Sequence, residues 1–260
     1  MIEKIEKAII KLRQHKPVIL NLTNFVTMDF VANCLLALGA APIMSVSEDE
    51  LEELVILSSV IYINIGTLDA SFVSRGDVAI ELAKKHNKPI VLDPVGAGAT
   101  KIRTDTAQRI MPHTSIIRGN ASEIMALKSK SYNTKGVESS NTPDEAIDIA
   151  QNLALKLHST IVTSGPVDFI TDGINALKIA HGSNLMPVVT GMGCALTAVI
   201  SAFRAVIDDD FQASAVGTYY FALCGEIAEL NSMHPGTFKS AFIDQLYAAD
   251  FQNMKKIYDQ

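Results

Sequence analysis

The stretch Val189-Thr190-Gly191-Met192-Gly193-Cys194-Ala195-Leu196-Thr197-Ala198 decides the fold of this chain. Residues 185–189 have the pattern of a strand, and the small apolar residues that follow the glycines have the pattern of a helix. Two glycines one residue apart remove side chains from the turn, so the free N–H groups of the helix start face outward and can bind an anion. Cys194 is the one protic side chain expected at the mouth of that site, and we expect the helix N-terminus to lower its thiol pKa. An anion site beside a thiol predicts phosphoryl or acyl transfer.

The same stretch has a purely structural interpretation. Glycine is common where a strand turns into a helix, and a cysteine on an apolar helix is commonly a small core residue. The rest of the chain has to decide between the two.

Composition limits the class of protein. The 260 residues are 48% hydrophobic and 19% charged, which predicts a large core, and we expect one domain over residues 1–260. A net charge of −6 without a basic cluster argues against a nucleic-acid partner. No apolar run approaches the ~18–20 residues that span a bilayer. Three cysteines without CxxC spacing and scattered histidines predict a reduced cytoplasmic protein without a structural metal.

Short β-branched runs alternate with longer helical patterns along the chain. This alternation predicts an α/β fold, a mainly parallel sheet between two layers of helices. Asp172-Gly173 separates two strand-like runs within residues 168–179 and predicts a late antiparallel hairpin. We expect only helices after residue 193 and a surface loop over residues 129–142. The predicted strands are residues 18–22, 42–46, 60–65, 89–93, 115–118 and 160–163, with helices over residues 71–87 and 143–158.

Polar or glycine-rich motifs follow the predicted strands. Ligands of such sheets bind outside the carboxyl ends of the strands, so these motifs should meet at one edge. The motifs are residues 64–68, 93–100, 118–123 and 163–165, together with the turn at Gly191 and Gly193.

Two carboxylates at this edge suggest a metal site. Asp93 directly follows an apolar strand, and Glu123 lies three residues after Asn120. The pair could hold Mg²⁺ through water molecules, because Mg²⁺ typically binds one or two carboxylates together with substrate phosphates. Asn120 and Glu123 alternatively form a capping box at a helix start. Arg118 could clamp a phosphate or form a surface salt bridge.

The common nucleotide-binding motifs are absent. The chain has no GxxxxGK[ST] sequence, and its two Gly-x-Gly turns lack the third glycine of a dinucleotide fingerprint. The protein-kinase motifs are also missing. A nucleotide site would therefore belong to another fold.

Several motifs together resemble one family. The chain is similar to hydroxyethylthiazole kinase at residues 21–33 (NLTNFVTMDFVAN), 36–44 (LALGAAPIM), 92–100 (LDPVGAGAT), 117–123 (IRGNASE) and 189–194 (VTGMGC). The resemblance implies a ribokinase-like three-layer sandwich that phosphorylates the hydroxyl of 4-methyl-5-(2-hydroxyethyl)thiazole for thiamine biosynthesis. It further implies ATP as co-substrate, Mg²⁺, and a homotrimer with substrate sites between subunits.

The resemblance also implies roles for individual residues. Cys194, Gly191 and Gly193 would be catalytic, and Cys194 stands where most ribokinase-like enzymes carry an aspartate base. Met192 replaces a small residue that is usual between the glycines, and Ser164 stands where threonine is common. The thiazole would contact Asn24, Val26, Met44 and Gly191; ATP would contact Arg118, Ser164 and Asn120; and the metal-phosphate positions would be Asp93 and Glu123.

Four other functions compete with this one. A kinase for a different small alcohol would lack the motifs around Asn24 and Met44. A nucleotide-dependent dehydratase of hydrated nicotinamide cofactors shares the fold but would keep an aspartate at position 194. A thiol hydrolase would need His181 or His234 beside Cys194. A protein that only binds a ligand would fit if Asp93 and Glu123 did not converge.

Overall fold

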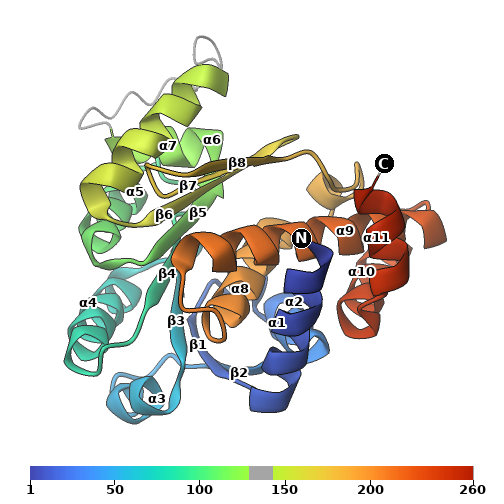
Figure 1. Cartoon of the computed structure of the whole chain (residues 1–260). Helices are drawn as coiled ribbons and strands as arrows, with labels where there is room; N and C mark the ends of the chain where they lie inside the picture. Colours follow the sequence, from blue (N-terminus) through green and yellow to red (C-terminus); the bar gives the residue numbers. More distant parts are fainter. Residues whose placement is uncertain (129–142, 260) are drawn as a thin grey trace.

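The computed structural model describes residues 1–128 and 143–259. At its centre is an eight-stranded sheet with the order β2-β1-β3-β4-β5-β6-β7-β8 (Figure 1). Neighbouring strands from β2 to β6 are parallel, whereas the β6–β7 and β7–β8 pairs are antiparallel. The strands are β1 (Val18–Leu22), β2 (Ala41–Met44), β3 (Val60–Asn64), β4 (Ile90–Asp93), β5 (Ile116–Asn120), β6 (Thr160–Ser164), β7 (Asp168–Thr171) and β8 (Ala176–Ile179).

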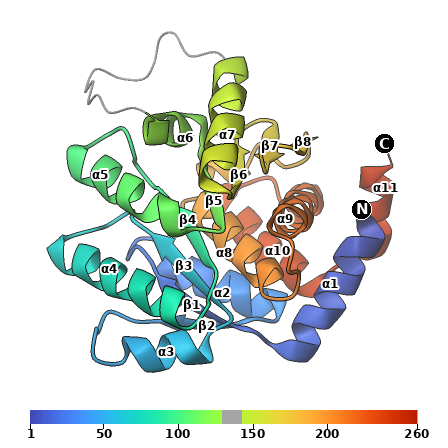
Figure 2. The ribbon, with the colours of Figure 1, turned by 60° about the vertical axis from the view of Figure 1, so that its left-hand side comes forward.

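Helices cover both faces of this sheet, as Figure 2 shows from a second direction. One hydrophobic core lies between the sheet and α1 (Ile2–His15), α2 (Met28–Leu38), α8 (Met192–Arg204), α9 (Asp210–Asn231), α10 (Pro235–Ala248) and α11 (Phe251–Tyr258). A second core lies between the opposite face and α3 (Leu51–Leu57), α4 (Ala70–Lys85), α5 (Lys101–Ile110), α6 (Ala121–Lys128) and α7 (Pro143–Leu157). The predicted three-layer α/β sandwich is confirmed.

Burial on both faces explains why the central strands are almost continuously apolar. All five residues of β3 are buried. Ile61 and Ile63 point into one core, and Val60 and Tyr62 point into the other. Successive residues of a strand face opposite sides, so a strand covered by helices on both sides is apolar along most of its length; in β3 only Asn64, at the end that meets the site, is an amide.

The late hairpin is also confirmed. β7 pairs with β8 from Asp168 opposite Ile179 to Thr171 opposite Ala176. Gly173 in the connecting loop has φ +92°, a conformation that favours glycine. The loop predicted over residues 129–142 lies outside the described residues.

The other six predicted strands are present with small shifts at their ends, but the strand predicted over residues 185–189 is wrong. A short 3₁₀ helix, η2 (Met186–Val188), occupies that position. Pro187 lacks the N–H that a sheet ladder requires, and the sheet already ends at β8. The apolar run before the glycines therefore packs as a tight turn before α8, and all regular elements after it are helices, as predicted.

Candidate active site

The glycine turn forms the N-terminus of α8, where two other parts of the chain approach it closely. Gly191 is the N-cap residue of α8 with φ +95°, and a Cβ there would lie 3.0 Å from Thr27 Cγ2. A Cβ on Gly193 would lie 2.5 Å from Arg118 Nη1. The two glycines thus admit the β1–α2 loop and Arg118 to the helix start, with the free N–H groups of α8 between them.

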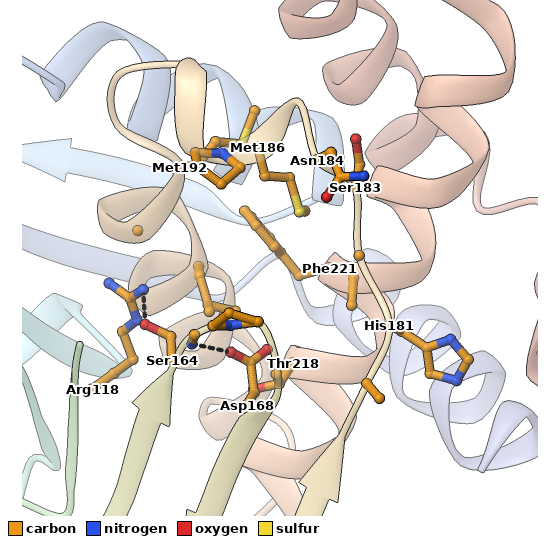
Figure 3. Close-up of a pocket in the computed structure, with 18 of the residues that line it drawn as sticks. Arg118, Ser164, Asp168, His181, Ser183, Asn184, Met186, Met192, Thr218 and Phe221 are labelled. Atoms are coloured by element: carbon orange, nitrogen blue, oxygen red, sulfur yellow. Dashed lines mark hydrogen bonds between the residues drawn. The ribbon is translucent and has the colours of Figure 1, made fainter. Parts of the chain in front are cut away.

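A cavity of about 560 Å³ lies beside this helix start (Figure 3). Its walls come from the ends of β5 and β6, the beginning of β7, the segment from residue 180 to 187, the first turns of α8 and the middle of α9. Among the predicted site residues, Arg118, Ser164 and Gly193 line it. Phe221 and Met186 add apolar surface to the wall opposite these polar groups.

Arg118 is a cation with spare hydrogen-bonding capacity. Its side chain is 11% exposed, it donates to Ser164 Oγ, and its Nη1 lies 3.9 Å from Asp93 Oδ2. Its Nε is buried without a partner. The interpretation as a surface salt bridge is wrong, because the guanidinium is largely buried; at the wall of a cavity, such a cation is suited to an anionic ligand.

Asp93 lies directly beneath the helix start and is completely buried. Its Oδ2 accepts a hydrogen bond of 2.8 Å from Thr197 Oγ1, whereas its Oδ1 has no partner. Burial raises the pKa of Asp93 to about 6; the charge of Arg118 opposes this shift and that of Glu123 adds to it. A buried carboxylate with one free oxygen fits a cation that is held there.

Glu123 and Asn120 form the capping box that was the structural alternative. Glu123 N donates to Asn120 Oδ1 at 2.9 Å, and Asn120 N donates to Glu123 Oε2 at 2.8 Å. Gly96 N donates to Glu123 Oε1 at 2.9 Å, which ties the β4–α5 loop to α6. The cap keeps the Glu123 charge close enough to act on Asp93. Asn120 is not among the residues that line the cavity, and its contact with ATP stays a prediction.

Cys194 lies on the other side of the helix start. It is not among the lining residues of the cavity, and its Sγ accepts a 3.4 Å hydrogen bond from Asn24 Nδ2. The expected lowering of its pKa is wrong. Burial raises the pKa of the Cys194 thiol, and the negative charge of Asp93 raises it further. Removing the thiol from water outweighs the partial charge of the helix end.

The β1–α2 loop is fixed around the thiol by Asn24. Asn24 Nδ2 donates to Asn64 Oδ1 at 2.9 Å, and Asn24 Oδ1 accepts from both the N–H and the hydroxyl of Thr27, each at 3.0 Å. The structure thus brings Asn24 and the first residues of α8 together. The other two predicted thiazole contacts lie farther out: Val26 is 70% exposed, and Met44 ends the edge strand β2.

Sequence reasoning missed several polar residues of this site. Asp168 and Thr218 line the cavity, and the Tyr62 and Thr197 hydroxyls reach Asp93. Helical spacing could have identified Thr197, which follows Gly193 by one turn. No sequence pattern indicated that Thr218 belongs to the site, because a single threonine within a long apolar helix does not differ from an ordinary core residue.

No group of three or more histidine, cysteine or acidic side chains that could hold a metal ion occurs among residues 1–128 and 143–259. In the same part of the chain, no helix is long and apolar enough to cross a membrane.

Comparisons with known proteins place this chain in a family. The model of the hydroxyethylthiazole kinase family matches residues 9–252. The chain belongs to the hydroxyethylthiazole kinase family. The hydroxyethylthiazole kinase of Chlamydia caviae is 52% identical to it over the whole length of both chains. The structure of the hydroxyethylthiazole kinase protein from Pyrococcus horikoshii superposes with a TM-score of 0.90 at 36% identity, covering 97% of this chain and 96% of that one.

A more distant neighbour supports the fold alone. The structure of an ADP complex of Bacillus subtilis pyridoxal kinase has a TM-score of 0.61 at 15% identity and covers 80% of this chain and 91% of that one. Membership of the hydroxyethylthiazole kinase family makes the chain a phosphotransferase with a ribokinase-like fold. The family name does not say how each side chain acts, so the roles of single residues have to be argued from their distances, burial and hydrogen bonds.

The half-buried acid Asp168 generates a prediction about stability. Its Oδ1 accepts a 3.0 Å hydrogen bond from Gly165 N, and burial raises its pKa to about 6, against the opposing effects of that bond and Arg118. The folded state therefore binds this proton more tightly than the unfolded chain, so the contribution of Asp168 to stability falls as the pH rises from about 4 to about 6. Asp168→Asn keeps an acceptor for Gly165 N and removes the charge. We expect it to raise the free energy of unfolding by about 1 kcal/mol at pH 7.

Urea denaturation at pH 7.5 and pH 5 measures this effect, and the gain should shrink at the lower pH. Asp208→Asn, at an exposed position, is the matched control for the change in net charge. A gain that grows toward pH 5, or that Asp208→Asn reproduces, would contradict the prediction.

Proposed function

We propose that residues 1–260 form one kinase domain that transfers the γ-phosphoryl group of ATP to the hydroxyl of 4-methyl-5-(2-hydroxyethyl)thiazole, a step of thiamine biosynthesis. One observation carries the proposal: at the α8 N-terminus, Arg118 of the cavity wall approaches Gly193, whereas Thr27, which is bonded to Asn24 beside Cys194, approaches Gly191. A phosphate donor in the cavity and an alcohol beside the thiol would meet at the same free N–H groups. The relatives that carry the name hydroxyethylthiazole kinase support this choice of alcohol.

The cavity side would bind ATP. Arg118 would release part of its contact with Ser164 and clamp the phosphates, while the Ser164 hydroxyl and the Gly193 N–H donate to them. The positive end of α8 would stabilise the negative charge that reaches the phosphoryl oxygens during transfer. Phosphoryl transfer relies mainly on such positioning and electrostatic stabilisation.

Asp93 and Glu123 would hold Mg²⁺. The buried Asp93 Oδ1, which has no protein partner, fits a cation reached through water. When bound, Mg²⁺ neutralises the phosphate charge and orients the phosphates. Glu123 would act from its capping position, since its carboxylate oxygens retain lone pairs beyond the hydrogen bonds that they accept from backbone N–H groups.

The opposite side would bind the alcohol. Asn24 and the main chain at Gly191 would position the thiazole and its hydroxyl, with Val26 and Met44 completing the pocket at its outer edge. The thiolate form of Cys194 would take up the hydroxyl proton as the oxygen attacks the γ-phosphorus. Because burial raises the thiol pKa, only a small fraction of Cys194 is thiolate near neutral pH, so its share of the rate enhancement should be small.

An assay of the purified protein tests this function. With ATP, MgCl₂ and a panel of small alcohols, we expect ADP release and a phosphorylated product with the thiazole alcohol above all others. Asp93→Asn should lower turnover by about 10²-fold or more, because it removes a charge that the cation requires, and leave thiazole binding nearly unchanged. Product that forms only with another alcohol would overturn the substrate assignment, and Asp93→Asn turnover equal to that of the wild type would overturn the metal assignment.

Substitutions at Cys194 test the role of the thiol. Cys194→Ala should keep measurable activity and lose roughly 10²-fold or less, the lower end of general-base effects. Cys194→Asp should restore or exceed wild-type turnover, since Asn24 Nδ2 already points at this position and would accommodate a carboxylate base. Steady-state kinetics of both variants, with circular dichroism as a control for folding, measure the contribution of the Cys194 side chain to turnover. A folded but inactive Cys194→Asp protein would point to covalent thiol chemistry instead.

We further propose a homotrimer with sites completed between subunits. Apolar side chains that are 59–70% exposed lie in the β1–α2 loop and after the edge strand β2, namely Phe25, Val26 and Val46. A second subunit would cover this surface and close the outer edge of the alcohol site. Light scattering at micromolar concentration should give about three times the 28.0 kDa chain mass. A stable monomer with full activity would contradict the trimer.

A further inference from the structure

Tyr62 carries a polar group into the middle of the core beneath the α8 N-terminus. The residue lies on β3, is completely buried and is surrounded largely by apolar side chains. Its hydroxyl accepts a 2.8 Å hydrogen bond from Asn64 Nδ2. Its single proton has two acceptors within reach, the main-chain carbonyl of Cys194 at 3.0 Å and Asp93 Oδ2 at 3.4 Å.

Thr197 repeats this arrangement from the other side of the carboxylate. Its hydroxyl lies 2.8 Å from Asp93 Oδ2 and 3.3 Å from the main-chain carbonyl of Gly193. Each of the two hydroxyls therefore lies between the same carboxylate oxygen and a carbonyl in the first turn of α8, and it can donate its one proton to either acceptor. We call Tyr62 and Thr197 the hydroxyl clamp.

The clamp contacts only one of the two Asp93 carboxylate oxygens. Oδ2 faces both clamp hydroxyls and the Arg118 guanidinium, whereas Oδ1 is buried and has no hydrogen-bond partner. A carboxylate held through one oxygen cannot rotate without breaking those contacts. Oδ1 is therefore held in one direction, at a set distance from the N–H groups of α8.

We propose that the hydroxyl clamp positions Asp93 relative to the α8 N-terminus, and thereby sets the distance between the cation and the N–H groups that would bind phosphate. The inference rests on the proposed function. Its physical reason is that phosphoryl transfer depends on placing charges accurately, and groups that hold a site must themselves be locked by packing and hydrogen bonds. Tyr62 and Thr197 are positioning residues, since they touch Asp93 and the α8 backbone.

A purely structural role for the same hydroxyls is the competing explanation, because any buried hydroxyl needs a partner. The chain contains a matched control for it. Tyr220 is also completely buried in the same core, and its hydroxyl donates to the Leu246 carbonyl at 2.7 Å. Ser201, one turn after Thr197 on α8, donates to the Thr197 carbonyl at 2.8 Å. Neither control hydroxyl contacts Asp93.

The experiment compares Tyr62→Phe with Tyr220→Phe, and Thr197→Val with Ser201→Ala, in the full-length protein. Each variant is measured for melting temperature, for kcat and KM with ATP-Mg²⁺ and the thiazole alcohol, and for ADP affinity by calorimetry with and without MgCl₂. Thr197→Ser, which keeps the hydroxyl, tests rescue.

We expect both clamp variants to lower kcat by about tenfold, with the KM for the alcohol within about twofold of wild type. Mg²⁺ should tighten ADP binding less in the clamp variants than in wild type, while metal-free ADP affinity stays the same. The controls should lose similar thermal stability and keep wild-type kcat. Thr197→Ser should recover most of the activity that Thr197→Val loses.

Two results would overturn the clamp: a Mg²⁺ effect on ADP binding that is intact in Tyr62→Phe and Thr197→Val, or a fall in kcat that the control variants share. A wild-type protein that binds ADP equally with and without Mg²⁺, or that phosphorylates no alcohol, would overturn the proposed function itself. The wild-type measurements therefore separate the two failures.

Discussion

The contact between α8 and the buried Asp93 carboxylate determines how the rest of the site is arranged. Asp93 ends β4, a central strand, and the Thr197 hydroxyl joins its carboxylate to α8. Ionising such a group in the core costs free energy, which is why its pKa rises to about 6. The charge of Arg118 is the largest contribution that offsets this cost, and the hydrogen bonds from Thr197 and Tyr62 offset a further part. The helix start, the carboxylate and the guanidinium therefore have to occupy one small region at the carboxyl edge of the sheet.

Much of the fold follows from local patterns. Strands buried on both faces, such as β3, are recognisable because most of their residues are apolar, and the Asp-Gly pair before Ile174 marks the hairpin. The prediction failed at residues 185–189, where hydrophobicity resembles a strand but Pro187 cannot donate to a sheet ladder and the segment forms a 3₁₀ turn instead. Apolar character indicated neither the form nor the burial of this segment, since no residue of η2 is buried.

Site residues were predictable where a local sequence motif indicates their role. Properties that depend on contacts between residues distant in the sequence were not. Arg118, Ser164 and Gly193 meet at one cavity, as their positions at strand ends and at a helix start indicated. The direction of the Cys194 pKa shift could not be obtained in this way, because it depends on burial and on a carboxylate 101 residues earlier in the sequence. The hydrogen bond between Asn24 and Asn64 likewise depends on how the β1–α2 loop folds back over β3.

The placement of the thiol and the cavity at one helix start has a consequence for the choice of substrate. The cavity is lined by residues from Arg118 onward, whereas the loop that surrounds the thiol consists of residues 23–27 near the beginning of the chain. None of those early residues lines the cavity, so changes in that loop leave its walls intact. Under the proposed function, the alcohol side and the phosphate side of the site therefore come from different parts of the chain. A change in the short early segment would then alter the choice of alcohol without changing the walls of the cavity.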